Sequence, residues 1–178
     1  MTEPRRSDLP SPFIIEWVQR LARPGGKALD LAAGRGRHVD VLATSGYRTF
    51  AVDRDITALS IAKRRAADRG QAVSCWCADI TATGLPPHTF DAIVVTRYLE
   101  RGLCATIAQS LAPGGCVFYE TFTEAQRAWG RGPTSPRHLL VTGELPQLFA
   151  GLEPVFYDEV DAPDAVARLV ARAASSRS

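Results

Sequence analysis

The sequence has little of several features that would assign its class at once. Only four of its 178 residues are cysteines, and Cys75, Cys77, Cys104 and Cys116 show no C-x-x-C spacing. A disulfide framework and a cysteine-based metal site are therefore not expected. No apolar run reaches the roughly 18 residues that span a bilayer, and the two N-terminal arginines precede no apolar segment. We expect reduced thiols, no metal, no membrane partner and a cytoplasmic location.

The sequence also lacks a strong excess of one charge. Its 21 basic and 19 acidic residues give a net charge of +2, which is far from the dense basic stripe of a nucleic-acid-binding protein. Nucleic acid is therefore not an expected partner. The length of 178 residues and the hydrophobic content of 46% predict one domain with its own core. Nothing in the sequence indicates the oligomeric state.

Short apolar runs alternate with helical stretches along the first two thirds of the chain. This alternation predicts a doubly wound parallel sheet with helices on both faces. The expected strands cover residues 28–31, 49–52, 73–77, 92–95 and 116–119. The expected helices cover residues 12–22, with Ser11 as the N-cap, and residues 37–44, 56–69 and 101–111.

The last third of the chain has a different pattern. Residues 152–160 and 165–171 resemble two strands joined by a short turn. Such a turn cannot form a parallel crossover, so the two strands are predicted to pair as an antiparallel hairpin. Residues 123–143 are rich in Gly, Pro, Arg and Ser and are long enough to form a lid. The expected organisation is one domain over residues 1–178, with a helix at 12–22, a core at 27–122, a lid-like segment at 123–143 and a hairpin at 152–172.

Acidic residues follow the predicted strands, where ligands bind in open parallel sheets. Asp30 ends the first strand and precedes a glycine loop, while Asp53 and Asp79 follow the second and third strands. Asp53 is placed to accept both hydroxyls of a ribose, because Asp55 is better placed to cap the next helix. Asp79 could accept an adenine amino group, or it could be an ordinary turn aspartate. Together the three acids indicate a site for a nucleoside with a cationic tail.

The glycine loop favours some nucleotide ligands over others. A dinucleotide site needs G-x-G-x-x-G, but counting from Gly34 the third glycine position is Val39. A phosphate-binding P-loop needs Gly-Lys-Ser/Thr, which the sequence lacks. An acid directly before the loop would repel a pyrophosphate and suits a positive charge. A dinucleotide-dependent oxidoreductase is therefore disfavoured.

Several motifs resemble those of class I S-adenosylmethionine-dependent methyltransferases. They are the segments at residues 30–36, 51–53, 77–79 and 111–115. More narrowly, residues 34–38, 119–122 and 130–145 are similar to small bacterial methyltransferases related to the tellurite-resistance group. The resemblance implies an α/β, Rossmann-like, seven-stranded sheet of order 3-2-1-4-5-7-6 with strand 7 antiparallel. This expectation agrees with the predicted hairpin.

The same resemblance implies roles for individual residues, with S-adenosyl-L-methionine as the cofactor. The loop at residues 32–36 would wrap the methionine portion, Asp53 would hold the ribose, Asp79 and Ile80 the adenine, and the backbone at Thr96 the ammonium group. The full expected cofactor-binding set is Asp30, Ala32, Ala33, Gly34, Arg35, Gly36, Asp53, Arg54, Asp79, Ile80, Thr96 and Arg97.

Two residues depart from the family pattern. Ala32 replaces the first loop glycine, which is tolerable if its φ is negative. Arg97 stands where it would lie beside a cationic sulfonium unless its side chain points away. These departures bear on the substrate class and on full activity.

No catalytic residue is obligatory for methyl transfer, and the candidates are Tyr98, Glu120 and Arg131. Tyr98 could border the methyl group or belong to the core, and Glu120 could be a general base or form only an ion pair. Arg131 in the lid-like segment could recognise an oxyanion. The expected function is methyl transfer to a small-molecule acceptor, an anionic one being an option. The alternatives are a non-catalytic nucleoside-binding protein and a methyltransferase acting on a macromolecule.

Overall fold

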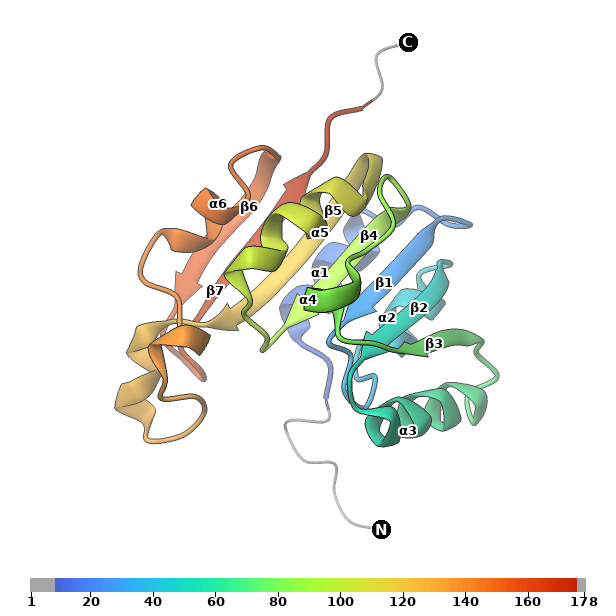
Figure 1. Ribbon diagram of the computed structural model, residues 1–178, viewed down its shortest axis with the longest axis horizontal. Coiled ribbons are helices and arrows are strands. Elements are labelled where there is room, and N and C mark those ends of the chain that lie inside the picture. The colour runs from blue at the N-terminus through green and yellow to red at the C-terminus, as the bar shows by residue number, and fades with distance from the viewer. Residues whose placement is uncertain (1–8, 176–178) are drawn as a thin grey trace.

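Seven strands form one mixed sheet in the computed structural model, which describes residues 9–175. The strand order is β3-β2-β1-β4-β5-β7-β6, with β7 antiparallel to both β5 and β6 and the other pairs parallel. The expected topology is therefore confirmed (Figure 1). The strands are β1 (Lys27–Leu31), β2 (Arg48–Asp53), β3 (Val73–Cys77), β4 (Phe90–Thr96), β5 (Leu111–Phe122), β6 (Glu153–Val160) and β7 (Val166–Arg172).

Helices cover both faces of this sheet. Figure 1 shows α4, α5 and α6 in front of the sheet and α1 and α2 behind it. The helices are α1 (Pro12–Arg20), α2 (Val39–Thr44), α3 (Ile56–Ala67), α4 (Ile80–Thr83), α5 (Cys104–Ser110) and α6 (Glu144–Leu148). Short 3-10 segments occupy Arg101–Leu103, Glu124–Trp129 and Pro136–His138. In the part of the chain that the structure describes, no helix has the length and apolar character to cross a bilayer.

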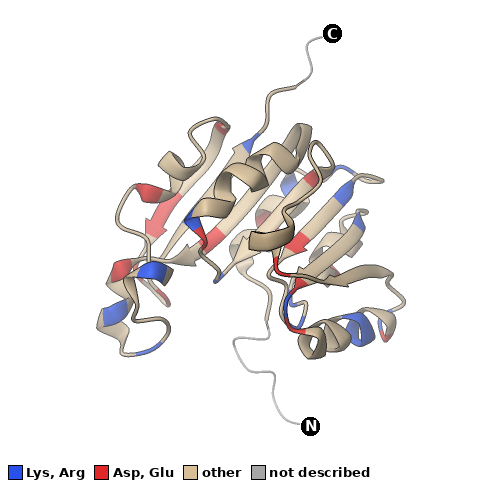
Figure 2. Ribbon diagram, viewed as in Figure 1, with Lys and Arg blue, Asp and Glu red and all other residues tan. Residues whose placement is uncertain are grey.

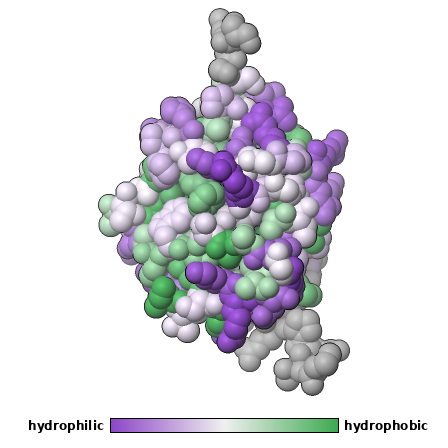
Figure 3. All heavy atoms as spheres, turned by 90° about the vertical axis from the view of Figure 1, so that its right-hand side faces the viewer, coloured by the Kyte–Doolittle hydropathy of each residue, from purple (hydrophilic) through white to green (hydrophobic). Residues whose placement is uncertain are grey.

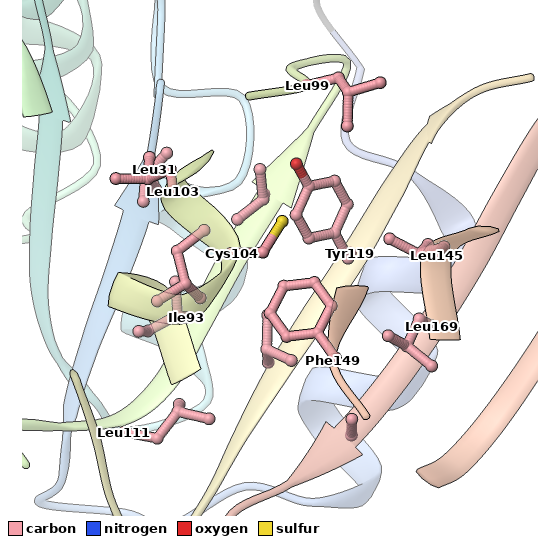
Figure 4. Close-up of a cluster of buried hydrophobic side chains, with 14 of the residues drawn as sticks. Leu31, Ile93, Leu99, Leu103, Cys104, Leu111, Tyr119, Leu145, Phe149 and Leu169 are labelled. Carbon is pink, nitrogen blue, oxygen red and sulfur yellow. The ribbon is translucent and has the colours of Figure 1, made fainter. Parts of the chain in front are cut away.

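A separate apolar core fills each side of the sheet. The front core surrounds Tyr119, whose ring lies 5.7 Å from that of Phe149 in α6. Figure 4 shows these rings between residues of β1, β4, α5 and β7. The back core holds Phe13, Ile14 and Trp17 of α1 against the sheet, as the apolar spacing of residues 12–22 predicts. The four cysteines are free thiols.

Several element boundaries differ from the sequence prediction, and three of the differences have a local reason. Helix α2 begins at Val39 because Gly36 has a φ of +70°, which ends the preceding turn outside the helical region. Strand β5 begins at Leu111, and not near residue 116 as predicted, so that it includes Pro113, Gly114 and Gly115. Gly115 there passes so close to β4 that a Cβ would lie 2.7 Å from the Phe90 carbonyl oxygen. Helix α5 ends at Ser110 because Leu111 is extended.

The edge strand β3 is only partly covered. Its side chains are exposed or half-buried, whereas most of those of the central strand β4 are buried. Figure 3 shows the side of the molecule that carries β3 and α3 in Figure 1, where hydrophobic and hydrophilic residues are interspersed. The most deeply buried part of the sheet therefore lies at its centre, around β1 and β4, and not at the β3 edge.

Candidate functional site

The carboxyl ends of β1, β2 and β4 border a cavity of about 600 Å³, which we call the cofactor cavity. Parallel pairing aligns these ends, since Asp30 lies beside both Ala51 and Val94 in the sheet. Acidic residues at the strand ends are visible in Figure 2. Of the expected cofactor residues, those lining this cavity are Ala32, Asp53, Arg54, Asp79, Ile80, Thr96 and Arg97. Its volume is within the usual range for sites that hold a small organic ligand.

The loop after β1 adopts left-handed backbone conformations at alternate residues. The φ angles are +54° at Ala32, +52° at Gly34 and +70° at Gly36. The negative φ that would make alanine tolerable at position 32 is therefore not present, and this alanine carries strain that glycine would not. A Cβ on Gly34 would meet nothing within 4 Å, whereas one on Gly36 would lie 2.6 Å from the Cβ of Ala62 in α3. Gly34 thus faces open space and Gly36 faces the protein.

The loop also borders a shallower hollow beside the cofactor cavity. Ala33, Gly34 and Arg35 line this hollow, and Ala32, Thr96 and Arg97 line both. The loop backbone is held to β2, because the Ala33 N–H donates to the Val52 carbonyl oxygen at 3.0 Å. The predicted loop residues are therefore brought to the same edge as Asp53 and Thr96, with Gly36 behind them.

Asp53 ties the glycine loop to the start of α3. Its Oδ2 accepts the Gly34 N–H at 2.8 Å and its Oδ1 accepts the Asp55 N–H at 2.9 Å. A carboxylate has about four acceptor sites, so Asp53 can still accept two hydroxyls. Asp55 caps α3 by accepting the N–H groups of Thr57 and Ala58, as expected. Asp55, and not Asp53, is therefore the residue that caps α3.

Asp79 begins the short helix α4 at the far side of the cavity. Its Oδ1 accepts the Thr81 N–H at 3.0 Å and the Thr81 hydroxyl at 2.6 Å. These bonds hold the pKa of the carboxyl below its usual value. Within residues 9–175, no group donates to Oδ2. Asp79 therefore acts as a turn aspartate through Oδ1. Its Oδ2 remains available for a ligand beside the largely buried Ile80.

The segment after β4 is held in an unusual backbone shape. Arg97 has a φ of +54°, and its N–H donates to the Glu120 carbonyl oxygen at 2.9 Å. Its guanidinium lies 3.6 Å from the Asp164 carboxylate in the hairpin turn and 5.8 Å from the Phe122 ring centroid. The charge of Arg97 therefore has an acidic partner inside the protein.

Tyr98 is half-buried and lines the cofactor cavity. Its carbonyl oxygen accepts the hydroxyl of Tyr119 at 2.9 Å, and Figure 4 shows that this hydroxyl points up between β4 and β5. Burial raises the pKa of the Tyr98 phenol, so the group stays protonated at neutral pH. The front core thus fixes the loop that carries Tyr98.

Asp30 and His38 lie underneath the loop and do not line the cofactor cavity. The Asp30 side chain is 1% exposed, and desolvation raises its pKa to about 8. No group in residues 9–175 pairs with its Oδ2. The direct ligand contact expected for Asp30 is therefore not seen in the cavity lining, and this carboxyl is protonated at pH 7.

His38 connects the N-terminal segment to β4, a link that sequence spacing does not reveal. Its Nε2 accepts the Ser11 N–H at 3.1 Å, and its Nδ1 lies 3.4 Å from the Thr96 hydroxyl oxygen. Accepting at Nε2 places the ring proton on Nδ1. Burial, followed by the charges of Arg37 and Arg97, lowers the pKa of His38 well below its ordinary value. His38 is a neutral structural residue behind Thr96.

Two catalytic candidates lie outside the cofactor cavity. Glu120 accepts the Ser11 hydroxyl at 3.0 Å and lies 3.8 Å from Arg168 Nε. Ser11 therefore occupies the N-cap position of α1 without capping it through its side chain. Arg131 lies 3.0 Å from Asp164, bonds to the Pro163 carbonyl oxygen and stacks on Trp129 at 5.1 Å. Arg131 is therefore tied to the hairpin turn, and its role in oxyanion recognition stays a prediction.

Several lining residues of the cofactor cavity are not predicted by the sequence. They come from the ends of segments that close over it: Leu99 and Glu100, Phe122, and Pro133. His138 from the predicted lid-like segment also lines it. Phe122 ends the largely buried strand β5 and could have been identified by that position. Pro133 could not, since it reaches the site through a loop without periodicity.

Comparisons with known proteins point to one family. A family model described as a methyltransferase domain matches residues 28–115. Ubiquinone biosynthesis O-methyltransferase of Idiomarina loihiensis is 27% identical over 122 residues, covering 65% of this chain and 50% of that protein. Protein-L-isoaspartate O-methyltransferase of Methylorubrum populi is 35% identical over 106 residues, covering 58% and 50%. The chain spans about half the length of these curated relatives.

Solved structures share the fold. TehB from Haemophilus influenzae superposes with a TM-score of 0.74 at 18% identity, covering 92% of this chain and 62% of that one. This likeness shows the shared fold alone, so the narrower resemblance to the tellurite-resistance group stays a prediction. The matched residues 28–115 include the glycine loop, Asp53 and Asp79. The chain therefore carries a methyltransferase domain of the class I S-adenosylmethionine-dependent type, for which S-adenosyl-L-methionine is the cofactor.

Proposed function

We propose that this protein transfers a methyl group from S-adenosyl-L-methionine to a small-molecule acceptor. The observation that carries the proposal is the convergence of Asp53, Asp79 and Ala32 of the glycine loop on one cavity at the strand ends, with the rest of the loop lining the adjoining hollow. Residues 32–36 and Thr96 would hold the methionine portion, Asp53 the ribose hydroxyls, and Asp79 with Ile80 the adenine. When bound, S-adenosyl-L-methionine supplies a methyl group activated by a sulfonium charge.

The residues of the cavity fit this cofactor. Gly34 leaves open space where a side chain would intrude, and Asp53 and Asp79 retain acceptor sites for hydroxyl and amino groups. The Arg97 guanidinium, which would oppose a nearby sulfonium, is paired with Asp164. The protein's contribution is to orient the acceptor and exclude water, which suits a reaction that needs no dedicated catalytic residue.

We propose that residues 123–143 cover the cavity as a lid within one methyltransferase domain spanning residues 1–178. Both ends of the segment are anchored, because the Leu140 N–H donates to the Phe122 carbonyl oxygen and the Glu124 N–H to the Leu140 carbonyl oxygen. Between these anchors, Pro133 and His138 line the cavity. Water exclusion by such a segment strengthens electrostatic contacts inside the site. Slower protease cleavage within residues 127–138 in the presence of S-adenosylhomocysteine would support this role.

A macromolecular acceptor is the alternative. One similar protein is named a protein-L-isoaspartate O-methyltransferase, and that name describes a protein acceptor for that enzyme. The absence of a basic excess in the sequence favours a small molecule over nucleic acid. A cytoplasmic location remains part of this proposal.

The direct test uses S-adenosylmethionine with an isotopically labelled methyl group and an extract separated by ultrafiltration into small and large molecules. The proposal predicts S-adenosylhomocysteine release and label in the small-molecule fraction. Label only in macromolecules would contradict the acceptor class. Cofactor binding without any release of S-adenosylhomocysteine would favour the non-catalytic alternative.

A further inference from the structure

A second cavity lies on the other side of Arg97 from the cofactor cavity. Its volume is about 290 Å³, and Arg97 lines both cavities. The N-terminal residues 9–13 form one wall, and the ends of β5, β6 and β7 form the others. No role in the proposed cofactor site uses this cavity.

Most of the wall area comes from apolar side chains. Phe13 is 4% exposed, Val166 is 8% exposed, and Val160 is half-buried at the end of β6. The N-terminal wall is fixed, because Ser11 donates its N–H to His38 and its hydroxyl to Glu120. The cavity can therefore bury a small ring or aliphatic group between preformed surfaces.

Most of the charged side chains that line this cavity form ion pairs. Arg97 faces Asp164 at 3.6 Å, and Arg168 lies 3.8 Å from Glu120 and 3.7 Å from Asp158. The two acidic lining residues are also committed, since Asp164 pairs with Arg131 and Glu120 accepts the Ser11 hydroxyl. Each of these groups has an opposite charge nearby.

Among the lining arginines in residues 9–175, Arg37 alone forms no ion pair, although Glu120, Asp30 and Asp164 lie near enough to raise its pKa. Its Nη2 is buried without a hydrogen-bond partner in residues 9–175, and Nη1 reaches only the Leu9 carbonyl oxygen at 3.5 Å. None of the ion pairs among these described residues includes Arg37. Burial, and next the charge of Arg97, lowers the pKa of Arg37. A largely buried guanidinium without an ion pair is costly, and an anion bound against it in the cavity lowers that cost.

We propose that the second cavity binds the methyl acceptor as a small organic carboxylate, with the carboxylate on Arg37 and the apolar body against Phe13, Val160 and Val166. The acceptor role rests on the proposed function, whereas carboxylate binding does not. The planar guanidinium matches a carboxylate bidentately. The apolar walls favour an organic acid over inorganic phosphate. The shared wall at Arg97 places the bound molecule next to the cofactor cavity.

The test uses two fluorinated probes of the same shape, 4-fluorobenzoate and 4-fluorobenzamide. Fluorine NMR line broadening of each probe is measured against protein concentration, with S-adenosylhomocysteine affinity measured on the same samples. We expect the benzoate to bind at least tenfold more tightly than the amide, because only the benzoate carries a negative charge. Equal binding of the two probes would overturn the proposal.

Two variants and one control locate the binding. Arg37→Met should weaken 4-fluorobenzoate at least tenfold, and Arg64→Met, which removes an exposed arginine of α3, should leave it unchanged. If Arg37→Met does not fold, Val160→Phe fills the cavity from its wall and should abolish benzoate binding with S-adenosylhomocysteine affinity intact. Unchanged benzoate binding in Val160→Phe would overturn the site, as would displacement of the probe by equimolar inorganic phosphate.

The same samples separate this proposal from the proposed function. Benzoate binding that depends on Arg37, in a protein that does not bind S-adenosylhomocysteine, would support the anion site and contradict the methyltransferase function. Tight S-adenosylhomocysteine binding without benzoate binding would overturn the anion site and leave the proposed function standing.

Discussion

Burial sets the protonation state of Asp30, and this makes the stability of the protein depend on pH. The folded carboxyl has a pKa of about 8, while the unfolded one titrates near its ordinary value of 3.8. Between these values the folded state holds a proton that the unfolded state has lost. The stabilising contribution of Asp30 is therefore complete below pH about 4 and is lost as the pH rises to about 8.

We predict that Asp30→Asn removes this dependence. Relative to the variant, the native protein should lose roughly 1.4 kcal/mol of unfolding free energy per pH unit between pH 5 and 7. Urea unfolding at pH 5, 6, 7 and 8 measures both proteins. Parallel pH profiles would show that Asp30 is ionised in the folded protein, and the account of its burial would be wrong.

Asp53 is expected to dominate cofactor affinity at the level of single residues. Asp53→Ala removes acceptors for the cofactor hydroxyls and releases the Gly34 and Asp55 N–H groups. We expect affinity for S-adenosylhomocysteine to fall at least tenfold, about 1.4 kcal/mol, and Asp53→Asn to lose less. Asp55→Asn is the control, since asparagine caps a helix nearly as well as aspartate. A calorimetric titration in which the alanine variant matches the native protein would remove Asp53 from the site.

At the scale of elements, the contact between the glycine loop and α3 should control stability. Gly36→Ala must place a Cβ 2.6 Å from the Ala62 Cβ at a φ of +70°. Gly34→Ala meets only the backbone cost, about 1–2 kcal/mol, because nothing lies within 4 Å of its Cβ. Gly36→Ala should therefore destabilise more than Gly34→Ala in urea unfolding.

A double-mutant cycle checks the cause. Adding Ala62→Gly to Gly36→Ala should recover part of the lost unfolding free energy, because it removes the methyl group that the new Cβ meets. If the two substitutions are simply additive, the loop does not press on α3 as the structure indicates.

The elements that the sequence predicts correctly are those with strong periodicity. The strands that become β1 to β4 and the hairpin of β6 and β7 have apolar or alternating runs bounded by turns. Helices α4 and α6 are missed because they span only four and five residues, too short for a 3.6-residue period to show. The start of β5 is misplaced because a Pro-Gly-Gly sequence usually ends an element and here lies within a strand.

The site is predicted where it depends on strand ends and missed where it depends on contacts between distant segments. The carboxyl ends of parallel strands lie at the same edge of a sheet. The positions of Asp53, Asp79 and Thr96 therefore follow from the strand prediction. The link from Ser11 to His38 spans 27 positions. The pairing of Arg131 with Asp164 spans 33. Neither contact has a local sequence pattern, so neither could be predicted from the sequence.

At the scale of the whole molecule, the fold places the cofactor and acceptor cavities side by side around Arg97. The central claim is that the first of them binds S-adenosyl-L-methionine. Its most direct test is thermal unfolding with S-adenosylhomocysteine, with NAD as the comparison ligand, each at 100 times the dissociation constant measured for S-adenosylhomocysteine. Binding should add about 2.7 kcal/mol, which for a chain of this size raises the melting temperature by roughly 5–10 °C. We predict that shift with S-adenosylhomocysteine and none with NAD; stabilisation by NAD alone would contradict the assignment.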